Sequence, residues 1–210
     1  MKKTISLLLS IIMVMSVFSV VPFSVNAQEV DVAVTSDLKS GDYFFTLDGT
    51  EATITSYKGT DTAVVIPSVL NNKFTVTSIS KKAFYRNDDI LSVTIPDTVR
   101  TIGAEAFSEC TALTRVNLSD SVESIAENAF YNCNSLASVK IPSSVTSLNP
   151  TAFLYCSALE KIEVDENNEV YDSRDNCNAV IKSDTNELVC GITNTVIPTS
   201  VTSIGTRAFY

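Results

Sequence analysis

The sequence contains no histidine and no tryptophan, and only six glycines and six prolines among its 210 residues. Without an imidazole, Ser-His-Asp catalysis, Cys-His catalysis and histidine-bound metal centres are excluded. Cations are also scarce: 15 basic residues stand against 24 acidic ones, and the net charge is −9. Nucleic-acid binding needs a surplus of clustered cations, so no nucleic-acid partner is expected.

Long hydrophobic runs are confined to the N-terminus. Lys2 and Lys3 precede an apolar stretch from Ile5 to Val21, and Ala27 supplies a small residue at a cleavage position. Residues 1–27 are therefore predicted to be a secretory signal peptide, with a retained membrane anchor as the alternative. The mature protein is expected to be extracellular, either secreted or associated with the cell surface, and to have no membrane span.

One pattern recurs along most of the chain. Four segments that begin at Ile79, Ile102, Ile125 and Leu148 align under one another with a period of 23 residues. Each contains an Ala-Phe pair, and apolar residues follow the pair at constant distances; the pairs lie at 83–84, 106–107, 129–130 and 152–153, with a further one at 208–209. A fixed period with fixed apolar positions predicts a solenoid whose repeats stabilise one another as neighbours.

Within each repeat, a short segment alternates apolar and polar residues, as in Val93-Thr94-Ile95 and Val139-Lys140-Ile141. This alternation predicts one strand per repeat with a single buried face. Pro96 and Pro142 follow two of these strands, where the missing N–H ends the ladder and the chain turns. The predicted fold class is therefore mainly β, with coils stacked about 4.8 Å apart.

The segment from Ile102 to Leu118, with its Ile-Gly-x-x-Ala-Phe-x-x-Cys-x-x-Leu-x-x-Val-x-Leu pattern, closely resembles the BspA-like leucine-rich repeat. The resemblance extends from about Val64 to the C-terminus. It implies a surface or secreted protein that binds host proteins, cells or glycans without catalysis. It also implies that residues 165–197, which interrupt the 23-residue register, are an insertion between repeats.

Four parts of the chain are expected. Residues 28–40 follow the signal peptide as a linker or lead-in, and residues 41–75 form an N-terminal cap with a β-hairpin at Asp48-Gly49 and a first ladder strand at Val64–Pro67. The solenoid spans 76–210, and its insert is an extra hairpin with strands at 180–181 and 188–189. Because the last repeat stops at Tyr210, the chain is expected to be truncated and able to self-associate through this open end.

Five cysteines occur, and three of them, Cys110, Cys133 and Cys156, share one repeat position. Buried free thiols are favoured there, although thiols in neighbouring coils would lie within bridging distance, so a disulfide or a metal remains an alternative. Cys177 and Cys190 lie on the insert and could pair if its strands run antiparallel.

The acidic stretch from Asp165 to Val170 is superficially similar to a calcium loop but lacks the glycine and the distal glutamate that such a loop needs. A solvated turn is favoured, and neither a metal nor a cofactor is expected. Paired carboxylates could hydrolyse a glycoside without histidine, but no such pair is identifiable. The protein is therefore predicted not to be an enzyme.

Two surfaces are candidates for binding. The first consists of the outward strand positions, whose residues vary while the apolar positions do not: Ser92, Arg115, Ser138 and Lys161 in one row, and Thr94, Asn117, Lys140 and Glu163 in the next. The second follows the phenylalanine position and includes Tyr85 and Tyr131. A plain solvated sheet and a partly buried corner are the respective alternatives.

The predicted function is noncatalytic binding or adhesion to an extracellular protein, cell or glycan whose identity is unknown. A recognition module of a larger exported enzyme or cell-wall assembly is the alternative, and a carboxylate-dependent glycosidase is a weaker one.

Overall fold

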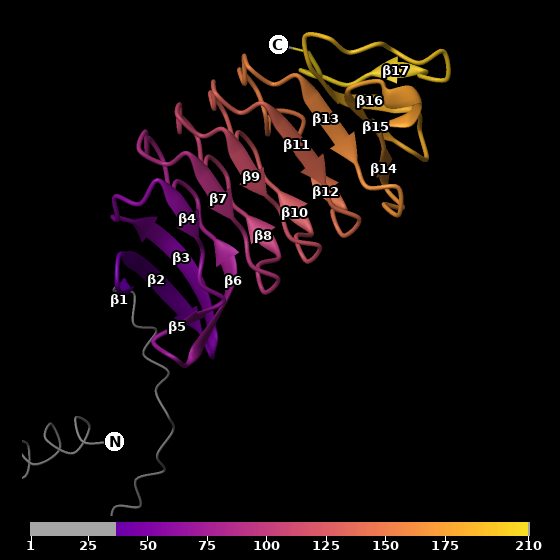
Figure 1. Ribbon diagram of the computed structural model, residues 1–210. Helices are drawn as coiled ribbons and strands as arrows, with labels where there is room; N and C mark the ends of the chain where they lie inside the picture. Colours follow the sequence, from indigo (N-terminus) through magenta and orange to yellow (C-terminus); the bar gives the residue numbers. More distant parts are fainter. Residues whose placement is uncertain (1–36, 210) are drawn as a thin grey trace, which may run out of the picture. The chain divides into compact units, whose positions relative to one another are not determined.

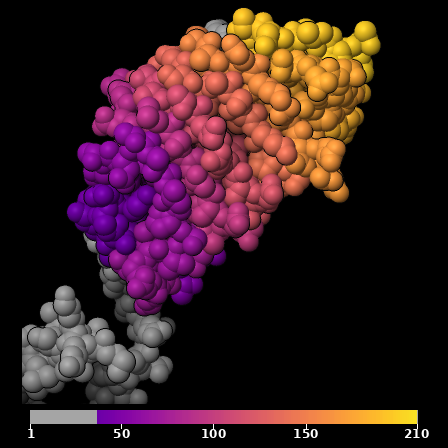
Figure 2. Space-filling model, in the orientation of Figure 1, coloured from indigo at the N-terminus to yellow at the C-terminus, as the bar shows by residue number. Residues whose placement is uncertain are grey.

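The structure, a computed structural model, describes residues 37–209. The expected signal peptide and residues 28–36 lie outside this range. Within it, successive coils follow one another from the indigo N-terminal end to the yellow C-terminal end without interleaving (Figures 1 and 2). Among the described residues, no helix is long and apolar enough to cross a membrane.

One side of the solenoid is a parallel sheet of five strands in the order β13-β11-β9-β7-β4. The strands are β4 (Ala63–Val65), β7 (Ser92–Thr94), β9 (Arg115–Asn117), β11 (Ser138–Ile141) and β13 (Lys161–Val164). From β7 onward, residues 23 positions apart lie side by side, as Val93 with Val116 and Val139 with Ile162. The period read from the sequence is therefore the length of one coil, which confirms the predicted solenoid.

The opposite side is built from short parallel strands at the isoleucine position of each repeat. These are β6 (Phe74–Ile79), β8 (Thr101–Ile102), β10 (Ser124–Ile125) and β12 (Ser147–Leu148). β5 (Val69–Leu70) pairs antiparallel with β6. Strand β6 spans the expected boundary between cap and solenoid at residue 76, so the sheet runs continuously through it.

A β-hairpin extends this second sheet at its N-terminal end. β2 (Tyr43–Asp48) and β3 (Glu51–Tyr57) pair antiparallel around Gly49, whose φ of 59° suits a glycine, and β3 continues the sheet by pairing with β6. β1 (Leu38–Ser40) pairs antiparallel with β2. The expected lead-in 28–40 is therefore wrong for residues 38–40, because their backbone joins the sheet edge.

A column of aromatic rings runs through the core. Phe84, Phe107, Phe130 and Phe153 stack with centroid separations of 4.7, 5.3 and 5.4 Å. Tyr57, from the hairpin, adds one more ring 5.2 Å from Phe84 and is itself 4% exposed. The hairpin thus covers the N-terminal face of the first coil. Its Tyr57 ring takes the place that the phenylalanine of a preceding repeat would occupy.

The insert begins later than the sequence analysis expected. Asp165 donates its N–H to Ile141 at 2.9 Å, Asn168 occupies the position of Val145 one coil later, and Tyr171 occupies that of Leu148. Residues 165–172 therefore keep the 23-residue register and complete a coil. The expected start at residue 165 is wrong because polar side chains stand at positions that were apolar in earlier repeats.

The extra residues follow Asp172. β14 (Tyr171–Asp172) and the short 3-10 helix η2 (Arg174–Asn176) lead into β15 (Ala179–Lys182) and β16 (Glu187–Gly191), which pair antiparallel as the predicted hairpin. The last repeat fragment, with β17 (Ser203–Ile204), pairs with β16 instead of with β12.

Phe209 stands at the repeat position of the four core phenylalanines, which predicts a core ring, and this prediction is wrong. Phe209 is 40% exposed and its ring lies against Gly191, because the inserted hairpin separates it from Phe153. Only Ala208 of this last Ala-Phe pair is buried, in a small cluster with Ile181 and Leu188.

Candidate functional site

The eight predicted strand residues lie on the outer face of the five-stranded sheet. The pairing places Ser92 beside Arg115, Arg115 beside Ser138, and Ser138 beside Lys161. The second row runs in the same way, from Thr94 through Asn117 and Lys140 to Glu163. Six of these side chains come from β9, β11 and β13, and Arg115, Asn117, Ser138, Lys140 and Lys161 are exposed.

The N-terminal end of this outer face is apolar, which the sequence analysis missed. β4 adds Ala63 to the first row and Val65 to the second, and Val65 is 69% exposed. The face therefore changes from apolar at β4, through uncharged polar residues on β7, to strands that each carry a charged residue from β9 to β13. The sequence contained the signal for this apolar end. In the predicted first ladder strand, Val65 follows the inward Val64, so alternation places Val65 on the outer face.

The charged end carries two ion pairs. Lys140 lies 2.7 Å from Asp165, and Lys161 lies 2.7 Å from Glu163 on the same strand. The hydrogen bond from Lys140 is the main reason that the pKa of Asp165 is lowered to about 2, and the same contact raises the pKa of Lys140. A glycosidase acid needs a raised carboxyl pKa, so Asp165 is unsuited to that role.

A cleft of about 400 Å³ opens where β13 meets the insert. Three predicted residues, Lys140, Lys161 and Glu163, line it together with the insert residues Asn176 and Asn178. Cations, carboxylates and amides thus surround one polar cavity at the end of the two rows. The insert's contribution was not predictable from the sequence, because nothing in the repeat pattern places residues 173–178 next to β13.

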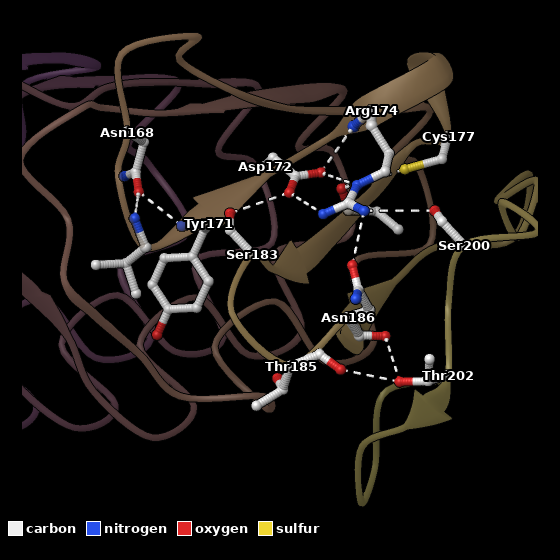
Figure 3. A network of polar contacts seen from close by, with 12 residues as sticks. Asn168, Tyr171, Asp172, Arg174, Cys177, Ser183, Thr185, Asn186, Ser200 and Thr202 are labelled. Carbon is white, nitrogen blue, oxygen red and sulfur yellow. Dashed lines mark hydrogen bonds and ion pairs between the residues drawn. The ribbon is translucent and has the colours of Figure 1, made fainter.

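A network around Arg174 holds the insert in place (Figure 3). The guanidinium forms an ion pair with Asp172 and donates to Asn186 at 2.8 Å, while Ser183 donates to Asp172 at 3.0 Å. Hydrogen bonding to Arg174 lowers the pKa of Asp172. One side chain therefore connects the end of the last full coil with the turn of the inserted hairpin.

The predicted tyrosine row is not continuous. Tyr85 donates to Glu109 at 2.8 Å, and Tyr131 lies two coils further along, with the buried Ser108 at the intervening position. The ring that contacts Tyr131 is instead Tyr155, at 5.3 Å and nearly perpendicular. Tyr155 stands one position later in its repeat, so an alignment by column does not find it.

Left-handed backbone recurs at this corner of every coil. The residues two positions after each core phenylalanine have positive φ: 57° at Arg86, 60° at Glu109, 57° at Asn132 and 61° at Tyr155. Asparagine adopts this conformation readily, whereas a bulky aromatic residue rarely does. Tyr155 is therefore held in an unfavourable conformation by the fold around it.

The five cysteines are free thiols, and all lie within residues 37–209. Cys110, Cys133 and Cys156 donate to the carbonyls of Phe84, Phe107 and Phe130 at 3.1–3.2 Å. Cys177 belongs to the small cluster at the insert, whereas Cys190 packs against the main core, so the two face different sides of the inserted hairpin.

Thiol alkylation of the native protein is expected to modify Cys156 first. Cys110 and Cys133 are fully buried, and burial raises the pKa of the Cys110 thiol to about 12, whereas Cys156 is partly exposed. Mass spectrometry of peptides after brief iodoacetamide treatment measures this, with denatured protein as the control for full labelling. Equal labelling of all three, or a disulfide between two of them, would contradict the described packing.

The acidic stretch forms a turn within the last full coil. Asp165 accepts the N–H of Asn167 at 3.0 Å and pairs with Lys140, while Asn168 is buried. Among residues 37–209, no group of three or more His, Cys, Asp or Glu side chains has an arrangement that could hold a metal ion.

The sequence repeats match a known protein family, and the fold is similar to those of solved structures. The family described as "BspA type Leucine rich repeat region" matches residues 77–210 in six copies. A leucine-rich repeat protein from Bacteroides capillosus ATCC 29799 is 33% identical over 62% of this chain and 99% of its own, with a TM-score of 0.58. The T. pallidum leucine-rich repeat protein is 28% identical over 61% of this chain and 71% of its own, with a TM-score of 0.51.

The pneumococcal vaccine antigen PcpA is similar in fold alone, with 18% identity over 83% of this chain and 62% of its own and a TM-score of 0.56. No curated protein matches the sequence. Since the family matches well over half of the residues, and the structure has the stacked 23-residue coils that its repeats require, this chain belongs to the BspA-type leucine-rich repeat family.

Proposed function

We propose that this protein is a secreted or cell-surface binding protein that attaches to an extracellular protein, cell or glycan through the outer face of strands β7 to β13. The observation that carries the proposal is the contrast between the two faces of these strands. Their inner side chains are nearly uniform and buried, whereas the outer ones differ from coil to coil and are exposed or partly exposed. Solenoid proteins commonly use such extended surfaces for recognition.

The outer face ends at a cavity whose lining suits a polar ligand. The cleft at β13 gathers lysines, carboxylates and amides, which are groups that give orientation and specificity to a polar ligand. Membership of the BspA-type family supports a binding role in general terms. Export of the protein is proposed from residues 1–27 of the sequence.

The strand face is expected to lose binding when its charge is reversed. The test is a solid-phase binding screen of residues 28–210 against extracellular matrix proteins and immobilised glycans. A variant carrying Arg115→Glu, Lys140→Glu and Lys161→Glu should lose at least about tenfold in affinity, because complementary charges determine association and register.

The matched control makes an equal change in net charge at a different surface. Lys39, Lys58 and Lys73 are exposed on the N-terminal cap, and their replacement by glutamate should leave binding within about twofold of the unmodified chain. Failure of the unmodified chain to bind any member of the screen would contradict the proposal. Equal loss in both triple variants would show that net charge alone, and not the strand face, is responsible.

We also propose that copies of this chain associate through the C-terminal coil. Val196, Ile197, Ile204 and Phe209 are 40–72% exposed there, and β17 pairs only with β16 among the described strands. An apolar surface next to a strand edge favours pairing with another chain. Sedimentation velocity on residues 28–210 should show concentration-dependent dimers that Ile204→Lys abolishes, with Leu91→Lys as control; a monomer at all concentrations would contradict this proposal.

A further inference from the structure

A second cleft, of about 350 Å³, lies on the corner side of the solenoid, between the turns that follow Phe130 and Phe153 and the segment that follows β16. None of the eight predicted strand residues lines it, and it is distinct from the charged cleft at β13. The residues that line it include Asn132, Asn134, Tyr155, Cys156, Ser157 and Thr193.

Every side chain that lines this cleft is uncharged, whereas five charged residues line the cleft at β13. Removing an ion from water into a site that offers no opposite charge is unfavourable. The second cleft therefore suits a neutral ligand. Its hydrogen-bonding side chains include two carboxamides and the hydroxyls of Ser157 and Thr193, so the ligand must be able both to donate and to accept hydrogen bonds.

The two carboxamides are held in place before any ligand arrives. Asn134 donates from its side-chain nitrogen to the Asn132 oxygen at 3.0 Å, and Ser157 donates to the Asn134 oxygen at 3.2 Å. An amide has two N–H donors and an oxygen with two acceptor sites, so each group keeps further capacity toward the cleft. A pair of adjacent hydroxyls on a ligand would complement this arrangement, because each hydroxyl is both a donor and an acceptor.

Tyr155 supplies the apolar wall. Tyr155 is 46% exposed, and the Tyr131 ring packs against its ring at an interplanar angle of 87°. A sugar ring presents C–H groups on one face and hydroxyls at its edge, and aromatic rings bind ligands that combine an apolar face with a polar edge.

We propose that this cleft binds a neutral oligosaccharide, with one pyranose ring on Tyr155 and its hydroxyls hydrogen-bonded to Asn132 and Asn134. The site is on a different surface from the strand face, so it does not depend on the function proposed above.

The test is a titration of residues 28–210 with four neutral tetrasaccharides: maltotetraose, cellotetraose, mannotetraose and the tetramer of N-acetylglucosamine. At least one should bind with a dissociation constant in about the millimolar range, as expected for a small polar ligand in an open site. Tyr155→Asn keeps a residue suited to left-handed backbone but removes the ring, and it should weaken binding at least about tenfold. Asn134→Ala should also weaken binding.

Two control variants and a second readout make the result specific. Tyr85→Asn, on a corner two coils away from Tyr131, should bind the sugar as the unmodified chain does. The triple charge-reversal variant of the strand face should also bind it normally, which separates this site from the proposed function. Bound sugar should slow the alkylation of Cys156, which lines the cleft. Thermal melts establish that each variant is folded.

The proposal is overturned if none of the four sugars binds at about 20 mM, well above the expected dissociation constant. It is equally overturned if Tyr155→Asn, once shown to be folded, binds as tightly as the unmodified chain. Binding of a neutral glycine-serine hexapeptide with the same dependence on Tyr155, in place of the sugars, would reassign the cleft to peptide recognition.

Discussion

Replacement of Phe130 by alanine is expected to lower the free energy of unfolding by about 3–5 kcal/mol. The Phe130 ring is fully buried and lies between Phe107 at 5.3 Å and Phe153 at 5.4 Å, so its loss leaves a cavity between two coils. In a solenoid each coil is stabilised by its neighbours, and a cavity in the middle weakens both interfaces. Urea denaturation followed by circular dichroism measures the change.

Tyr131→Ala is the matched control, because the residue adjoins Phe130 but is only partly buried at the coil corner. It should cost no more than about 1 kcal/mol. If the two variants unfold at the same urea midpoint, the assignment of Phe130 to the interior and Tyr131 to the corner is wrong. Separate transitions for the two halves of the chain would locate the weakened interface directly.

The second large effect is expected at Asn168, whose replacement by valine should destabilise the protein by about 3 kcal/mol. The Asn168 side chain donates to the carbonyls of Pro142 and Val145 and accepts the N–H groups of Val170 and Tyr171, all at 2.8–3.0 Å. Valine would leave these backbone groups unpaired in a buried turn, at a cost of about 1–3 kcal/mol for each group that water does not reach.

This substitution tests whether the repeat pattern or the tertiary contacts determine which residue is most stable at position 168. The three preceding coils have Val99, Val122 and Val145 at the same position, all fully buried, so the pattern alone would favour valine at residue 168. Asn167→Ala is the control: Asn167 is exposed, and its replacement should change stability by no more than about 0.5 kcal/mol. A variant Asn168→Val that is as stable as the unmodified chain in thermal and urea denaturation would show that the four hydrogen bonds contribute little.

The same two residues, Phe130 and Asn168, show why the sequence predicted the solenoid well and its C-terminal part less well. Where a coil buries apolar side chains, the 23-residue period is visible, and strands, stacking and inward positions follow from it. At Asn168 and Tyr171 the core position is filled by a polar group whose partners are backbone atoms one coil away. The polar composition of this stretch indicates a solvated turn. Only its alignment with the preceding coil shows that the turn is buried.

The candidate sites divide in the same way. The outer rows of strand residues were predictable from the sequence, because strict alternation fixes which side chains face outward once the inner face is apolar. It did not determine the charged cleft beside β13 or the uncharged cleft beside Tyr155, which both need residues of the insert to lie against an earlier coil.

The 23-residue period does not predict which residues of the earlier coils lie beside Asn176 and Thr193. The Arg174 network and the pairing of β16 with β17 place the insert, and both depend on contacts between segments that no period relates. The sequence therefore determined the repeating coil and its two faces through the periodic burial of apolar side chains. The tertiary structure decided where the repeat is interrupted and which cavities the interruption creates, because those depend on non-periodic hydrogen bonds between distant parts of the chain.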